Sequence, residues 1–152
     1  MTPKKIIASI VYCLPFFLIL SSTSMFILFA LGVFFGLGLL EADQRYFYRY
    51  YSEKKESESE TFLATRSFLF LLTLIPLSIF VITSTMSMLG IGMIMGILLN
   101  LLIEMTIYRA WPQAFKKRFL DELKVKPTFS LIAQVFVAGL AFFILMNLLI
   151  IF

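Results

Sequence analysis

Three long stretches without a charged residue run through this sequence. They cover residues 6–40, 68–103 and 129–152. The third has the length of one membrane-spanning helix, because a hydrocarbon core of ~30 Å needs ~20 residues at ~1.5 Å each. The first two are too long for one crossing, since a straight helix of that length would measure ~52 Å. We therefore expect a membrane protein in which the two longer stretches bend.

A short run of hydroxyl residues lies near the middle of each long stretch, at 21–24 and 83–85. We interpret each stretch as two helices joined by a Ser/Thr turn. All 13 Lys and Arg residues then lie on one side, whereas single crossings would divide them eight against five. Cytoplasmic loops carry an excess of Lys and Arg. The sequence therefore predicts five spans, with the N-terminus in the cytoplasm and the C-terminus outside.

The expected fold is an all-α polytopic transmembrane bundle of two tandem hairpins and a C-terminal helix, with one cytoplasmic interfacial amphipathic helix. Its parts are hairpin 1 (1–43), a cytoplasmic loop (44–65), hairpin 2 (66–108), the amphipathic helix (109–127) and the fifth span (128–152). The five spans lie at about 3–22, 24–43, 66–83, 85–108 and 128–152. A cleaved signal peptide competes for residues 1–24, but no small-residue cleavage site follows them.

Composition excludes several kinds of chemistry. Hydrophobic residues make up 61% of the chain and charged residues 14%, against about 45–50% and about 25% in soluble domains. The sequence has no His and a single cysteine, Cys13, which rules out imidazole catalysis, His-based metal sites and an internal disulfide. No dyad, carboxylate pair or phosphate loop is recognisable in the spans. We expect neither an enzyme nor a bound cofactor or metal, and the net charge of +4 favours anionic headgroups over nucleic acid.

The first two stretches resemble each other. Pro15 and Pro76 stand at an offset of 61, and two Gly-x-x-x-Gly pairs follow at an offset of 60: Gly32, Gly36, Gly92 and Gly96. Such small-residue faces let transmembrane backbones touch, so the pattern predicts a parallel repeat whose second and fourth spans pack together. Two alternatives stay open: a likeness of composition only, and homodimerisation through the same glycines.

Polar residues at the edges of the spans form a candidate site for an ion or small solute. They are Glu41, Asn100, Glu104 and the turn residues Ser22, Thr23, Thr83, Ser84 and Thr85. Their ordinary roles are helix capping and interhelical hydrogen bonding. The functional alternatives are an anion site at the two turns and ion transport at Asn100. Glu104 is expected at the cytoplasmic boundary of its span.

Basic and aromatic residues of the charged loops are candidates for binding lipid headgroups or a partner protein. They are Arg45, Arg49, Trp111, Phe115, Lys116, Lys117, Arg118 and Phe119. Phe115 and Phe119 recur at a spacing of four with basic residues between them. This pattern predicts an amphipathic helix lying on the headgroups, with Trp111 as its interfacial anchor. Docking of a partner through the same face is the alternative.

Four segments carry a resemblance to known sequences. Residues 40–45 (L-E-A-D-Q-R), 66–70 (R-S-F-L-F), 80–90 (F-V-I-T-S-T-M-S-M-L-G) and 95–104 (M-G-I-L-L-N-L-L-I-E) are similar to a group of uncharacterised multipass membrane proteins of small-genome, uncultured bacteria. The likeness covers roughly residues 40–125. It implies a bacterial inner membrane and no particular activity. Asn100 stands where such proteins are expected to have His, which puts a metal or proton role there in doubt.

These observations favour a non-enzymatic integral membrane subunit with a structural or assembly role, in a homo-oligomer or a larger membrane complex. The alternative is a small oligomeric channel or transporter for an ion or small solute. A lipid-modifying enzyme is a distant third.

Overall fold

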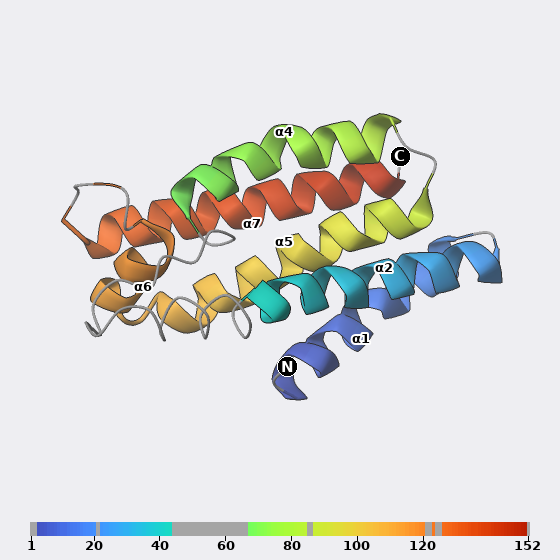
Figure 1. The fold of residues 1–152 in the computed structure, drawn as a ribbon, viewed down its shortest axis with the longest axis horizontal. Coiled ribbons are helices and arrows are strands. Elements are labelled where there is room, and N and C mark those ends of the chain that lie inside the picture. The colour runs from blue at the N-terminus through green and yellow to red at the C-terminus, as the bar shows by residue number, and fades with distance from the viewer. Residues whose placement is uncertain are drawn as a thin grey trace.

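The computed structural model describes residues 3–20, 22–43, 67–84, 87–120, 123 and 126–151. The regular structure in these ranges is helical, which confirms the all-α fold class. The ranges contain six α-helices: α1 (Pro3–Ile19), α2 (Thr23–Ala42), α4 (Phe68–Ser84), α5 (Met88–Tyr108), α6 (Pro112–Phe119) and α7 (Phe129–Ile151). Figure 1 shows them as a bundle.

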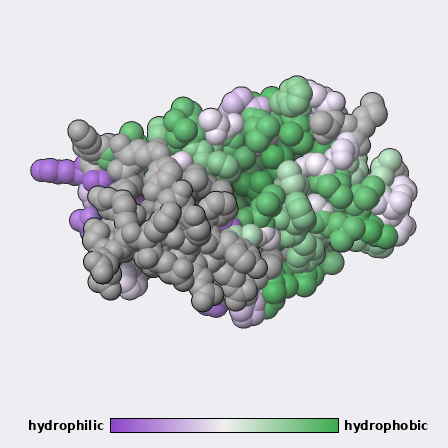
Figure 2. Space-filling model, viewed as in Figure 1, coloured by the Kyte–Doolittle hydropathy of each residue, from purple (hydrophilic) through white to green (hydrophobic). Residues whose placement is uncertain are grey.

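Three of these helices, α2, α5 and α7, are long and apolar enough to cross a membrane. Large apolar side chains are exposed on α1, α2, α4, α5 and α7, among them Leu18, Leu69 and Val137. Figure 2 shows the same apolar surface over the helices, with hydrophilic residues gathered toward the end where α6 lies. Exposed apolar side chains in this number fit contact with lipid chains and not with water. The chain is therefore a membrane-embedded protein.

Helices α1 and α4 have 17 residues each. At ~1.5 Å per residue they measure ~25 Å, a few ångströms less than a typical hydrocarbon core. Each contains one proline, Pro15 and Pro76, and each is followed within a few residues by the next helix.

Helix α5 is the centre of the bundle. It contacts α1, α2, α4, α6 and α7, and in Figure 1 it runs between the α1–α2 pair and the α4–α7 pair. Twelve of its 21 residues are buried. Helix α7 is the opposite case, because only Ile132 and Met146 among its 23 residues are buried.

The most extensive helix contact joins α2 and α5 through four glycines. A β-carbon added at Gly32 would overlap the carbonyl oxygen of Leu89, and one added at Gly92 would overlap that of Phe29. Adding 60 to the α2 residue of one contact and subtracting 60 from its α5 residue gives the other contact. Gly36 and Gly96 follow the same rule, facing the carbonyls of Met93 and Val33. The sequence offset therefore recurs as a two-fold relation between parallel helices, and both glycine faces are covered within the chain.

The helix starts differ in how they are capped. The Ser87 Oγ accepts a hydrogen bond from the Gly90 N–H at 3.3 Å at the start of α5. Ser22 precedes α2 but makes no side-chain capping bond, and its hydroxyl lies 2.8 Å from that of Ser24. The expected capping by the first Ser/Thr turn is therefore absent at Ser22.

Candidate functional site

Four charged side chains from four helices meet at one end of the bundle. Lys5 Nζ donates to Glu41 Oε1 and to Glu104 Oε1, both at 2.8 Å. Arg118 Nε donates to Glu104 Oε2 at 2.9 Å, and Nη2 lies 2.9 Å from the same oxygen. We call these four residues the charge cluster and the end of the bundle that holds them the charged end. In these contacts two cations face two carboxylates.

Each member of the charge cluster stands where the fold brings separate helix ends together. Lys5 lies in the first turn of α1, Glu41 in the last turn of α2, and Glu104 one turn before the end of α5. A helix dipole disfavours a cation near its N-terminus and an anion near its C-terminus. These three residues are thus unfavourable within their own helices, and the contacts between helices compensate them.

The inner part of the charge cluster is shielded from solvent. The side chains of Lys5 and Glu104 are 7% and 3% exposed, whereas Glu41 is 25% exposed. The guanidinium carbon of Arg118 lies 4.8 Å from the ring centroid of Tyr108, a cation–π contact that fixes the arginine beside Glu104. Removing one partner of a buried ion pair costs about 3–5 kcal/mol, because the other charge is left uncompensated.

Two buried polar residues lie one helical turn deeper, Ser9 on α1 and Asn100 on α5. The Ser9 hydroxyl donates to the carbonyl of Lys5 at 2.7 Å, so it is satisfied within its own helix. Asn100 is fully buried, and among the described residues neither its amide nitrogen nor its oxygen has a hydrogen-bond partner. An unpaired buried amide costs about 1–3 kcal/mol. Asn100 therefore destabilises the core unless another group binds its amide.

A second polar contact joins α1 to α7. The Tyr12 hydroxyl donates to Asn147 Oδ1 at 2.8 Å, and Asn147 Nδ2 donates to the Phe143 carbonyl at 2.8 Å. The Tyr12 ring packs among Phe16, Phe29 and Phe143. Both amide groups of Asn147 are used, so this pair ties the last helix to the first.

The structure brings together only part of the candidate polar site. Glu41 and Glu104 share Lys5, and Asn100 follows one turn deeper. The turn residues lie far from them, because Ser22 and Thr23 precede α2 or begin it, and Thr83 and Ser84 end α4. The Thr83 hydroxyl donates to the carbonyl of Ile79 at 2.7 Å, which leaves its donor already used. Thr85 lies outside the described residues.

Helix α6 differs from the expected amphipathic helix in length and in what its apolar face contacts. It spans Pro112–Phe119 and not 109–127. Phe115 and Phe119 are completely buried in the hydrophobic core of the protein, with their ring centroids 5.0 Å apart. They therefore do not lie on the headgroups or offer a docking face for a partner, which corrects that expectation. Arg118 is occupied as well, in the charge cluster.

Other members of the docking set remain at the surface. Trp111 is 69% exposed, Lys117 is exposed and Lys116 is half-buried. Arg45 and Arg49 lie outside the described residues. The surface that α6 offers to a membrane is thus its basic side together with Trp111.

Sequence reasoning singled out both carboxylates of the charge cluster but not Lys5, which it treated as a topology signal. A usable signal was present, because Lys5, Ser9, Cys13 and Phe16 recur at helical spacing and are the buried residues of α1. Polar and small residues on one face of an otherwise apolar helix indicate the side that faces protein. The sequence analysis also did not predict the hydrogen bond from Tyr12 to Asn147, whose partners are far apart in the chain.

No group of three or more His, Cys, Asp or Glu side chains that could hold a metal ion occurs in the described ranges. Comparison with family models, with curated proteins and with solved structures finds no match to this chain.

Proposed function

We propose that this chain is a five-span, non-enzymatic subunit of a membrane assembly, formed with further copies of itself or with a larger partner. In this proposal α1–α2 and α4–α5 are two hairpins and α7 is the fifth span. The charged end faces the cytoplasm of a bacterial inner membrane, with the N-terminus there and the C-terminus outside. The positions of Lys5, Glu41, Glu104 and Arg118 at one end support this orientation.

The observation that carries an assembly role is the outward face of α7. Gln134 is exposed there, in the second turn of a helix whose other side-chain amide, Asn147, is bonded within the chain. An amide that faces hydrocarbon without a partner is costly, and transmembrane helices commonly satisfy such groups across an interface. Small or short side chains share this exposed face: Ser130, Ala133, Val137 and Ala141. They allow close approach of another helix.

Cysteine crosslinking tests self-association. The single native cysteine, Cys13, is first replaced by Ser, and Val137→Cys then places a thiol on the outward face of α7. We expect an oxidised dimer in native membranes. Leu72→Cys, at an exposed position of α4, is the matched control and should remain monomeric. Gln134→Leu should weaken the crosslink if the amide is shared between copies.

Extraction in lipid particles without detergent tests the larger complex. A stoichiometric partner that crosslinks to residue 137 would support a hetero-assembly. A monomer that neither crosslinks nor copurifies with another protein would overturn the proposed function.

Asn100 favours a second candidate, a small channel or carrier for an ion or small solute. Its buried amide lies on α5 one turn from Glu104 and one turn from Gly96, the glycine that contacts α2. Flux through liposomes that contain the purified protein tests this candidate, with Asn100→Leu as the variant. Flux that this substitution abolishes would favour transport, and absence of flux in both proteins would favour the subunit.

A further inference from the structure

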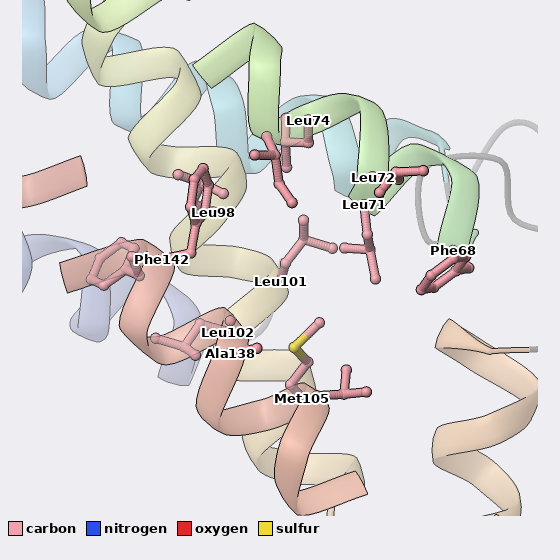
Figure 3. A pocket seen from close by; sticks show the side chains of 14 residues that line it. Phe68, Leu71, Leu72, Leu74, Leu98, Leu101, Leu102, Met105, Ala138 and Phe142 are labelled. Carbon is pink, nitrogen blue, oxygen red and sulfur yellow. The ribbon is translucent and has the colours of Figure 1, made fainter. Parts of the chain in front are cut away.

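An apolar groove opens between α4, α5 and α7. Its volume is about 230 Å³, and no polar side chain lines it. Leu71 and Leu74 line it from α4, Leu101 and Met105 from α5, and Gly139 and Phe142 from α7. Figure 3 shows side chains of the three helices pointing into the same space. Apolar cavities of ~150 Å³ hold a molecule such as benzene, so this groove has room for a segment of hydrocarbon chain.

The groove runs from near the charged end to about the middle of the bundle. Its lining begins at Phe68, the first residue of α4, and reaches Met105, one turn before the end of α5. On α7 it includes Val135 and Gly139, two to three turns after the helix start. Acyl chains of the leaflet on that side occupy this depth.

A cation lies one helical turn beyond the groove lining on α5. Arg109 follows Met105 by one helical turn toward the charged end. Its guanidinium carbon lies 5.3 Å from the ring centroid of Phe136, which neighbours the lining residue Val135 on α7. The residue is exposed, and its guanidinium can present several N–H donors to a phosphate. The apolar groove would receive an acyl chain, and the arginine one turn beyond it would face the negative headgroup of the same phospholipid.

We propose that the groove between α4, α5 and α7 binds one acyl chain of an anionic phospholipid, with Arg109 holding the phosphate of its headgroup. The groove lies on the inner side of α7, away from the outward face with Gln134. The lipid site is therefore independent of the proposed assembly, and either can fail without the other.

Native mass spectrometry of the full chain released from detergent micelles tests this site. The probes are phosphatidylglycerol and phosphatidylcholine with identical acyl chains. We expect tighter binding of one phosphatidylglycerol, by roughly 5- to 10-fold, the weight of one arginine beside a headgroup with net negative charge. Phosphatidylcholine has the same phosphate, but its choline neutralises that charge. Arg109→Gln should reduce phosphatidylglycerol binding to the phosphatidylcholine level. Lys117→Gln removes an exposed charge from α6 and should leave the preference unchanged.

A second pair of variants tests the acyl-chain part of the site. A β-carbon at Gly139 meets only the flexible sulfur of Met105, at 3.4 Å, so Gly139→Leu fills the groove without striking backbone. We expect it to weaken binding of both lipids by about tenfold, the weight of two buried methylene groups. Val137→Leu, on the opposite face of α7, should have no effect. Circular dichroism and gel filtration verify folding, and Ala138→Leu replaces Gly139→Leu if that variant does not fold.

Several results would overturn the proposal. One is equal affinity for the two lipids, and another is an equal loss of preference in Arg109→Gln and Lys117→Gln, which would mean general surface attraction. A third is full competition by millimolar inorganic phosphate, because the site would then recognise the free anion and not a lipid.

Discussion

Replacing Lys5 by Met removes the cation that Glu41 and Glu104 share. The side chain keeps its length and its apolar stem, so the change isolates the charge. Glu104 would retain Arg118 at 2.9 Å but lose its second partner while only 3% exposed. Breaking a buried ion pair costs about 3–5 kcal/mol. We expect a value near ~3 kcal/mol here, because Arg118 still compensates Glu104 and Glu41 can be hydrated.

Equilibrium unfolding in mixed micelles, followed by far-ultraviolet circular dichroism, measures this loss. Lys4→Met is the matched control, since Lys4 is exposed and undergoes the same chemical change in the neighbouring position. We expect that control to shift the free energy of unfolding by less than about 0.5 kcal/mol.

A double variant separates lost packing from stranded charge. In Lys5→Met/Glu104→Gln, the most deeply buried carboxylate is neutral, and the remaining charges on Glu41 and Arg118 reach solvent. We expect most of the stability to return, because replacing both partners of a buried pair is often close to neutral. Equal stability of Lys5→Met and Lys4→Met would refute the reasoning, since the charge cluster would then not hold the helix ends together.

Three further variants examine the glycine contact, the orientation and the docked helix. Gly36→Ala should destabilise the bundle by about 1–3 kcal/mol, because its β-carbon would overlap the facing backbone of α5. Gly38→Ala is the control, since a β-carbon there meets open space and should leave stability unchanged or raise it. Similar unfolding curves for the two variants would contradict this reasoning. With the native cysteine replaced, a membrane-impermeant maleimide should label Thr23→Cys from outside only and Ser57→Cys from inside only; the reverse pattern would invert the orientation. Phe119→Ala should cost about 3–5 kcal/mol in micelle unfolding, and no change would mean that α6 is not packed on the core.

The spacing of apolar residues and glycines and the positions of charged residues predicted most of the fold. The apolar stretches without charged residues predicted helices. In the structure these helices begin and end within a few residues of the expected bounds. The offset of 60 between the glycine pairs is visible in the sequence, because close backbone contact requires residues without a side chain. Charge exclusion from hydrocarbon is strong enough that Glu41 and Glu104 could be placed at helix ends from sequence alone.

The sequence did not predict which surface an amphipathic helix packs against or which residues form ion pairs. An amphipathic helix has the same pattern whether lipid or protein receives its apolar face, so Phe115 and Phe119 were assigned to headgroups although they enter the core. Lys5 was indistinguishable from a flanking lysine, because its role depends on carboxylates 36 and 99 residues away. Such long-range pairing is fixed by tertiary structure and leaves little local trace.

The contact between α2 and α5 has the geometry of an isologous interface, in which one surface meets an equivalent copy of itself. Here the two copies belong to one chain, with the first ending near residue 43 and the second starting near residue 67. The connection between them keeps the two surfaces at a high effective concentration. A halved chain, expressed as two separate fragments, would present the same complementary glycine faces. The α2–α5 contact is therefore organised as a dimer interface whose two halves are covalently linked.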